Sequence, residues 1–165
     1  MPESYTNFKK EIREYITSNF NVDSSILDVG PGIGTYATLL REYNNIDCVE
    51  IFQPYIDRYN LSKVYRKTYN ANIVDFEYEY YDIIIFGDIL EHLSVLDAQK
   101  VLKYAYSRCK EIIVSVPYRY RQGIHEDNIY EIHLQDDLTP QLMHQRYPEL
   151  KCVNSDNIIG FYIKN

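Results

Sequence analysis

The sequence has few of the residues on which metal frameworks and disulfide-stapled proteins depend. It contains only three cysteines, Cys48, Cys109 and Cys152, which stand singly and without the pairwise spacing of a metal site or a disulfide framework. We therefore expect three buried thiols in a reducing compartment. The sequence predicts no metal site.

Long apolar runs and an excess of positive charge are also missing. No segment approaches the roughly 20 apolar residues that span a bilayer, and the start, MPESYTNFKKEI, lacks the basic and apolar regions of a signal peptide. The chain has 17 Lys and Arg against 24 Asp and Glu, so it offers no basic surface to neutralise phosphates. We expect a soluble, cytoplasmic protein with no membrane span, for which nucleic acid is a disfavoured partner.

Three of the six glycines gather in one stretch, ILDVGPGIGTYATLL, at residues 26–40. Apolar residues leading into Asp28 and a Gly-x-Gly-x-Gly turn, with a helical pattern after it, predict the first strand, loop and helix of a nucleotide-binding α/β fold. Gly30, Gly32 and Gly34 permit unusual backbone conformations and a close approach of ligand to main chain. Position 35 is Thr, so the spacing differs from the Gly-x-Gly-x-x-Gly of dinucleotide folds.

Strand and helix patterns alternate along the rest of the chain, and 165 residues suit a single domain, 1–165. This alternation predicts an α/β fold with one doubly wound, mostly parallel sheet of about seven strands, an antiparallel terminal strand, and helices on both faces. Residues 118–138 have no clear period, and we expect a substrate loop there. Helices are predicted at 5–20 (within an N-terminal region 1–22), 33–43, from Pro54, at 94–107 and at 139–146, and strands from Ile26 and at 46–51, 64–69, 81–87, 112–116, 150–153 and 158–163.

Polar side chains follow the predicted strands at their carboxyl ends. Glu50 lies 20 residues after Gly30, where a nucleoside-binding fold carries the carboxylate that accepts hydrogen bonds from ribose hydroxyls. Asn72 follows the next strand and is the polar residue suited to meet an adenine edge, and Asp88 follows the apolar strand 81–87. Ligands of open α/β sheets bind at this edge, so we expect these groups to share one site.

With these motifs in order and at normal spacing, the sequence resembles the class I (Rossmann-like) S-adenosylmethionine-dependent methyltransferases, in particular the small type 11, ubiquinone-methyltransferase-like group. The four matching motifs are DVGPGIG at 28–34, Glu50, Asn72 and YDIIIFGDILEHL at 81–93. The family usually has Asp at the third motif, whereas Asn72 can donate as well as accept a hydrogen bond. The resemblance covers most of the chain.

The resemblance also implies a set of contacts with the cofactor, S-adenosyl-L-methionine. The glycine loop would lie beneath the methionine portion, Glu50 would hold the ribose hydroxyls, and Asn72 would bond the adenine edge. Ile51 and Ile73 would sandwich the adenine, and Asp88 would sit near the methionyl amino group. The implied cofactor residues are Asp28, Gly30, Gly32, Gly34, Glu50, Ile51, Asn72, Ile73, Asp88 and Ile89.

The residue types suit this cofactor on chemical grounds as well. S-adenosylmethionine is a sulfonium cation without phosphate, so its site needs carboxylates and neutral backbone. Asp28, Glu50 and Asp88 supply an acidic rim, and the first loop contains no Lys or Arg. Methyl transfer is an in-line displacement that proceeds by alignment and exclusion of water. A base is required only if the acceptor must lose a proton.

His133 and His92 are the candidate catalytic residues. The segment IYEIHL around His133 resembles a stretch of sugar- and small-molecule-modifying relatives in which a His approaches the methyl side of the cofactor. A structural or orienting role for His92, and a capping or packing role for His133, are the alternatives, and His125 is expected to be a solvated loop residue. The candidate substrate residues, for which a solvated loop is the alternative, are Tyr118, Arg119, Arg121 and Tyr130.

The leading functional interpretation is methyl transfer to a small-molecule or glycan-like acceptor, with S-adenosyl-L-homocysteine as product. One alternative is an NAD-dependent oxidoreductase, which Gly30 and Glu50 would suit but which leaves Asp28 and the misplaced third glycine unexplained. The other is an inactive methyltransferase-like binding module. The acceptor atom and the oligomeric state do not follow from the sequence.

Overall fold

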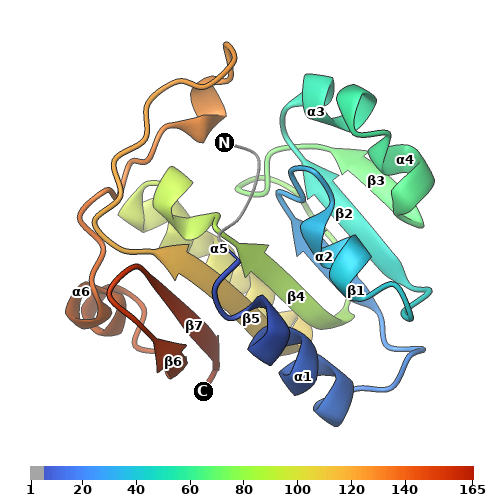
Figure 1. Cartoon of the computed structure of the whole chain (residues 1–165), viewed down its shortest axis with the longest axis horizontal. Helices are drawn as coiled ribbons and strands as arrows, with labels where there is room; N and C mark the ends of the chain where they lie inside the picture. Colours follow the sequence, from blue (N-terminus) through green and yellow to red (C-terminus); the bar gives the residue numbers. More distant parts are fainter. Residues whose placement is uncertain (1–5) are drawn as a thin grey trace.

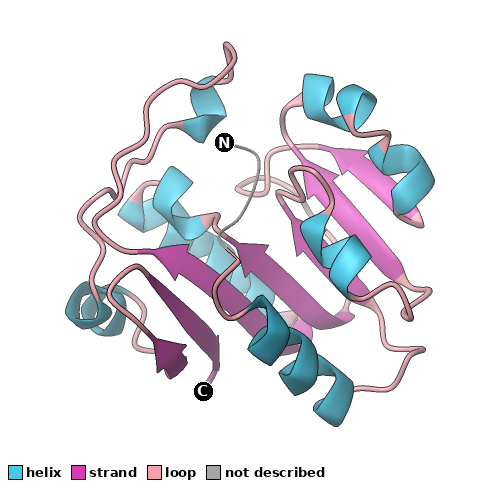
Figure 2. Cartoon of the chain, viewed as in Figure 1, coloured by secondary structure: helices cyan, strands magenta, loops and turns pink. Residues whose placement is uncertain are grey.

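The structure, a computed structural model, describes residues 6–165. It consists of one sheet with helices on its two faces (Figures 1 and 2). The predicted helix start at Tyr5 lies outside the described residues. The strands are β1 (Ile26–Val29), β2 (Ile46–Glu50), β3 (Lys67–Asn70), β4 (Tyr81–Gly87), β5 (Cys109–Pro117), β6 (Leu150–Ser155) and β7 (Ile159–Lys164). The helices are α1 (Lys9–Asn19), α2 (Thr35–Leu39), α3 (Gln53–Arg58), α4 (Leu61–Val64), α5 (Val95–Ser107) and α6 (Pro140–Arg146), with short 3₁₀ turns η1 (Leu90–His92) and η2 (Ile129–Glu131).

The sheet has seven strands in the order β3-β2-β1-β4-β5-β7-β6. All pairs from β3 to β5 are parallel, and β7 runs antiparallel to both β5 and β6. This confirms the predicted fold class. Because the chain leaves β1 toward β2 and β3 and then returns to add β4 on the other side, the strand order reverses between β1 and β4. Open α/β sheets bind their ligands at such a reversal.

The central strands are buried on both faces, as their continuous apolar runs predict. Successive side chains of a strand point to opposite faces, and in β4 Ile84 and Phe86 pack with α5 and α6, whereas Ile83 and Ile85 pack with α1 and α2. All four side chains are fully buried. Two apolar cores therefore fix β4, and with it the residues that follow β4 at the carboxyl edge.

Several predicted element boundaries are wrong. The strand predicted at 112–116 extends from Cys109 to Pro117, and the strand predicted at 150–153 extends to Ser155. The helix predicted at 33–43 covers only Thr35–Leu39, because Gly34 has a left-handed backbone (φ +84°) that precludes an earlier start, and a turn from Leu40 to Tyr43 ends it. The strand predicted at 64–69 begins only at Lys67. Val64 closes the short helix α4, after which the Tyr65 side chain turns inward to Asp28.

The predicted start of the helix at 139–146 is confirmed, whereas the prediction for the cysteines is confirmed only in part. Thr139 caps α6 by accepting a hydrogen bond from Leu142 N at 3.1 Å, and Pro140 occupies the first helical position. Cys48 and Cys109 are buried as expected, but the expected burial of Cys152 is wrong, because it lies on the outermost strand β6 and is exposed. No helix within residues 6–165 is both long enough and apolar enough to cross a membrane.

Candidate functional site

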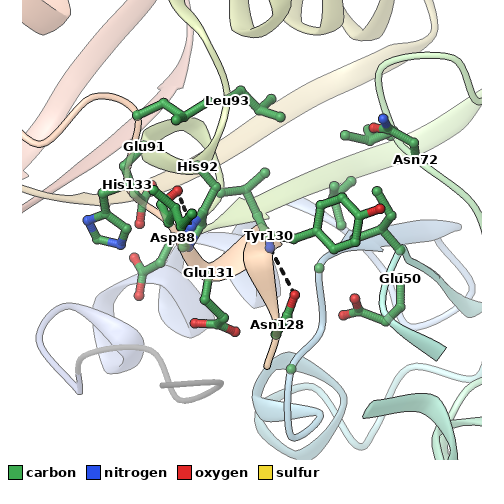
Figure 3. Close-up of a pocket in the computed structure, with 18 of the residues that line it drawn as sticks. Glu50, Asn72, Asp88, Glu91, His92, Leu93, Asn128, Tyr130, Glu131 and His133 are labelled. Carbon is green, nitrogen blue, oxygen red and sulfur yellow. Dashed lines mark hydrogen bonds between the residues drawn. The ribbon is translucent and has the colours of Figure 1, made fainter. Parts of the chain in front are cut away.

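A cavity of about 340 Å³ opens at the carboxyl edge of the parallel strands (Figure 3). Its walls come from the ends of β1, β2 and β4, the residues after β3, the turn η1, and the 120–134 part of the long loop. Its volume falls in the range of small-molecule sites, about 300–1,000 Å³. The loop predicted to bind substrate thus forms one wall of the site predicted to bind a nucleoside.

The cavity gathers residues that are far apart in the sequence. All the predicted cofactor residues except Asp28 and Gly34 line it. In Figure 3, Glu50 and Asn72 lie at one end, Asp88, Glu91, His92 and His133 lie toward the other, and the Tyr130 ring lies between. We call these the nucleoside end (Glu50, Asn72 and the glycine loop) and the histidine end (Glu91, His92 and His133).

The glycine loop is tightly packed beneath the nucleoside end. Gly30, Gly32 and Gly34 all have positive φ, which side chains rarely adopt. A Cβ atom on Gly30 would lie 2.1 Å from Cδ1 of Ile89, the residue that follows Asp88. The loop after β1 and the loop after β4 are therefore in direct contact, and a side chain at position 30 would be strained at its φ of +62° and would displace the Ile89 side chain.

Asp28 lies behind the loop rather than in the cavity. Its carboxylate is 1% exposed and accepts a hydrogen bond of 2.6 Å from Tyr65 Oη. Burial raises the pKa of Asp28 to about 6. The predicted acidic rim is therefore corrected to Glu50 and Asp88, and Asp28 supports the loop from inside.

The side chains of Glu50 and Asn72 each accept a hydrogen bond from the backbone N–H group two residues further along the chain. Glu50 Oε1 accepts a hydrogen bond from Phe52 N at 2.8 Å, and burial raises the pKa of Glu50 to about 7. Asn72 Oδ1 accepts one from Val74 N at 3.0 Å. These bonds restrain the positions of both side chains.

Asp88 is tied to a buried network that sequence reasoning missed. Asp88 has a left-handed backbone (φ +58°), and its Oδ1 accepts a hydrogen bond from Ser115 Oγ at 3.0 Å. Ser115 in turn contacts Tyr36 and the ammonium of Lys9, which is 8% exposed and donates to Tyr36 Oη at 2.8 Å. Burial opposes the charged form, yet Tyr36, Asp88 and Asp28 together raise the pKa of Lys9. The position of Lys9 on the apolar face of α1, one turn before Ile12, is the sequence feature from which its burial could be predicted.

The histidine end brings together His92 and His133, the two candidate catalytic residues. Their rings meet edge to face with centroids 4.6 Å apart. Burial, with His133 as the second cause, lowers the pKa of His92 to about 4, and burial also lowers that of His133. Both imidazoles are therefore neutral at neutral pH. His125 is half-buried, pairs through its backbone with Asn128, and is absent from the cavity lining.

Glu91, next to His92, belongs to the motif at 81–93, but the sequence predicts no role for it. It is 1% exposed, and neither of its carboxylate oxygens has a hydrogen-bond partner among the described residues. Burial raises the pKa of Glu91 well above its ordinary value, with Asp88 as the second cause. An unpartnered buried carboxylate is costly, and its burial could not be read from the sequence.

The predicted substrate residues fall into two groups. Tyr130 lines the cavity, whereas Tyr118, Arg119 and Arg121 are absent from its lining. The Tyr118 side chain is buried and its hydroxyl pairs with that of Tyr162 on β7, and the two arginines are exposed.

Comparison of this chain with known proteins identifies its family and supports its fold. The family model described as a methyltransferase domain matches residues 3–148. No curated protein matches the chain. Among solved structures, an S-adenosylmethionine-dependent methyltransferase from Clostridium acetobutylicum ATCC 824 is 12% identical over 98% of this chain and 92% of its own, with a TM-score of 0.72.

Two further structures illustrate the range of similar proteins. Magnesium protoporphyrin IX methyltransferase from Synechocystis PCC 6803, solved with bound S-adenosylmethionine, is 11% identical over 95% of this chain and 78% of its own, with a TM-score of 0.62. The N-methyltransferase NodS from Bradyrhizobium japonicum WM9 is 12% identical over 96% of each chain, with a TM-score of 0.64. At such identities these structures show the fold alone, whereas the family model covers most of the sequence. The chain belongs to the class I methyltransferases, whose methyl donor is S-adenosylmethionine.

Proposed function

We propose that this protein transfers the methyl group of S-adenosylmethionine to a hydroxyl of a small-molecule or glycan-like acceptor bound at the histidine end. The observation that carries the proposal is the division of one cavity into a nucleoside end and a histidine end, with Asp88 toward the latter (Figure 3). A methyl donor and its acceptor must meet in a single water-excluding space.

The lining of the cavity fits the sulfonium cofactor. The lining residues include the carboxylates Glu50 and Asp88 but, within the described chain, no Lys or Arg. A pyrophosphate cofactor would lack a cation there, whereas a sulfonium nucleoside finds favourable charge. In this proposal Glu50 holds the ribose hydroxyls, the Asn72 amide nitrogen bonds the adenine edge, and Asp88 pairs with the methionyl ammonium. Ile51 and Ile73 flank the adenine.

The bound cofactor supplies an activated methyl carbon. The protein orients the two substrates, excludes water and provides a proton acceptor. His133 Nδ1 lies 2.7 Å from the Tyr120 carbonyl oxygen and donates its proton there. This leaves His133 Nε2 as a neutral acceptor for the hydroxyl proton of the acceptor. His92, beside it, holds the His133 ring in place.

The exposed rim of the cavity suits an acceptor with an apolar or ring-shaped body. Ile129, Tyr130 and Leu134 line the cavity and are also exposed, at 58%, 47% and 61%. An aromatic ring at the mouth of a site can stack on a sugar or a planar molecule. These contacts support a small-molecule or glycan-like acceptor.

Labelled methyl transfer tests the proposal. Purified protein is incubated with S-adenosylmethionine carrying a labelled methyl group and with fractionated metabolites, glycans and macromolecules, and S-adenosylhomocysteine and NADH affinities are measured by calorimetry. We expect S-adenosylhomocysteine binding and label in a small-molecule or glycan fraction. Binding without transfer to any fraction would support the inactive binding module, and affinity for NADH alone would support the oxidoreductase.

A further inference from the structure

We propose that Glu91, His92 and His133 bind a divalent first-row transition-metal ion at the end of the cavity. One ligand atom from each of these residues lies within 4.8 Å of the other two. Two imidazoles and a carboxylate, with remaining positions open, are the donor set of catalytic zinc sites and of other first-row metals. Three further observations support the site.

The first observation is the unpartnered carboxylate. Glu91 is 1% exposed, and both of its oxygens lack a hydrogen-bond partner among the described residues. Buried carboxylates are ordinarily paired with a cation, bonded to donors or bound to a metal. The buried ammonium of Lys9 is already engaged by Tyr36 and Ser115. A metal ion between Glu91 and the two imidazoles would give this carboxylate a cationic partner.

The second observation concerns the outward nitrogens of the two histidines. His133 Nδ1 lies 2.7 Å from the Tyr120 carbonyl oxygen, and His92 Nδ1 lies 3.4 Å from that of Ile132. If each Nδ1 donates its proton to a carbonyl, each Nε2 keeps a free lone pair. Metal-binding histidines are almost always oriented in this way by an acceptor on their other nitrogen.

The third observation is the rigidity of the scaffold. The backbone N–H groups of Leu134 and Gln135 both donate to the Glu91 carbonyl oxygen, at 2.8 and 3.0 Å. The Gln135 side chain then donates to the carbonyl oxygens of Leu90 and Leu93, at 2.8 and 3.1 Å. The loop that carries His133 is thus pinned to the turn that carries Glu91 and His92. A binding site of fixed geometry requires such support.

The metal would act on the acceptor, and this part of the inference rests on the proposed function. An acceptor hydroxyl that binds at an open metal position would have a lowered pKa and would lose its proton to solvent on binding, before the methyl group is transferred. Its oxygen then forms a bond to the methyl carbon, the carbon–sulfur bond breaks, and the bonding electron pair passes to sulfur, which leaves as a neutral thioether. His133 would then contribute as a metal ligand rather than accept the proton itself.

Cobalt binding tests the metal site without reference to activity. Metal-free wild type, Glu91→Gln, His92→Ala and His133→Ala are titrated with Co²⁺ by calorimetry and visible absorption. His125→Ala and His144→Ala are the controls, because both histidines lie outside the cavity lining. We expect wild type and controls to bind one equivalent and the three variants to bind at least about 100-fold more weakly. Retained S-adenosylhomocysteine affinity shows that the variants are folded.

The outcomes separate this inference from the proposed function. Wild type that binds no Co²⁺, or equal binding by wild type and the three variants, overturns the metal site. Methyl transfer that persists after chelation, with no metal bound, overturns the role of the metal in the reaction and leaves the methyltransferase proposal standing. A metal bound by these three residues in a protein that transfers no methyl group supports the site and contradicts the proposed function.

Discussion

The nucleoside end and the histidine end of the cavity are built in different ways. The nucleoside end uses single residues at strand ends, such as Glu50 at the end of β2, and is shaped largely by backbone. The histidine end joins the turn after β4 to the loop that carries His133, through hydrogen bonds to the Glu91 carbonyl oxygen. The first end depends on strand register and the second on tertiary contacts, so their contributions can be separated by substitution.

His133→Ala should have the largest effect and should act only on the histidine end. Whether His133 accepts a proton or binds a metal, its loss should lower kcat by about 100- to 10,000-fold. S-adenosylhomocysteine affinity should stay within about threefold, because His133 is far from Glu50 in the cavity (Figure 3). Steady-state kinetics and calorimetry on His133→Ala, with His125→Ala as the matched control, measure both quantities. Equal losses in the control would contradict this account.

Glu50→Ala should have the converse effect, which is to weaken cofactor binding at the nucleoside end. Loss of a carboxylate that accepts hydrogen bonds from ribose hydroxyls costs about 1.5–3 kcal/mol, which weakens S-adenosylhomocysteine binding by about 10- to 100-fold. Calorimetry measures the dissociation constant, and Glu79→Ala, an exposed acid outside the cavity, is the control. Unchanged affinity in Glu50→Ala would remove Glu50 from the cofactor site.

Gly30→Ala should destabilise the protein by straining the glycine loop. The added Cβ would lie 2.1 Å from Ile89 Cδ1, at a backbone φ of +62°. Strain and overpacking of this kind lower the free energy of unfolding by about 1–3 kcal/mol. Gly123→Ala is the matched control, because a Cβ there meets nothing within 4 Å. Chemical denaturation of both variants should therefore separate them, and equal stability would show that the loop relaxes freely.

The pH dependence of cofactor binding should show the smallest effect. Burial raises the pKa of Glu50 to about 7, with Glu131 and Asp28 as neighbouring acids that add to the shift. Ribose hydroxyls bond best to the ionised carboxylate, so S-adenosylhomocysteine affinity should rise with pH and level off above about 7, by at most tenfold per pH unit below it. Calorimetry from pH 6 to pH 8, with Glu50→Gln as control, measures this rise. An affinity that falls over this range would contradict the assignment.

The same raised pKa has the opposite effect on the stability of the cofactor-free protein. Because Glu50 holds its proton more tightly when folded than when unfolded, the unfolded chain binds fewer protons between its ordinary pKa of about 4.3 and about 7. The Glu50 contribution to stability therefore falls as pH rises through this window. Glu50→Gln should remove that part of the pH dependence.

Sequence reasoning predicted the fold and the nucleoside end because both follow local rules. The apolar run of β4 and the glycines after β1 fix the sheet and its carboxyl edge, and the prediction for Glu50 follows from its position at the end of β2. Local rules failed where a single backbone conformation or distant contact decided the outcome. The left-handed Gly34 shortened α2, and the bond from Tyr65 to Asp28 shifted the start of β3.

The histidine end was predicted only in part. His92 and His133 were chosen for their residue type and motif, but their proximity depends on Gln135 and Leu134, whose bonds to the turn after β4 have no sequence pattern. The unpartnered state of Glu91 likewise depends on what surrounds it in space. Lys9 could have been noticed, because a lysine on an apolar helix face must find partners when it is buried.

The most direct test of the division into two ends is to measure binding and chemistry separately in the same two variants. S-adenosylhomocysteine affinity and the single-turnover rate at saturating S-adenosylmethionine are determined for Glu50→Ala and His133→Ala with the acceptor identified by labelled transfer. We predict that Glu50→Ala weakens binding and keeps its single-turnover rate within about tenfold of wild type, whereas His133→Ala keeps its binding and loses its rate. If both variants lose both properties to the same extent, the two ends do not act separately and the account is wrong.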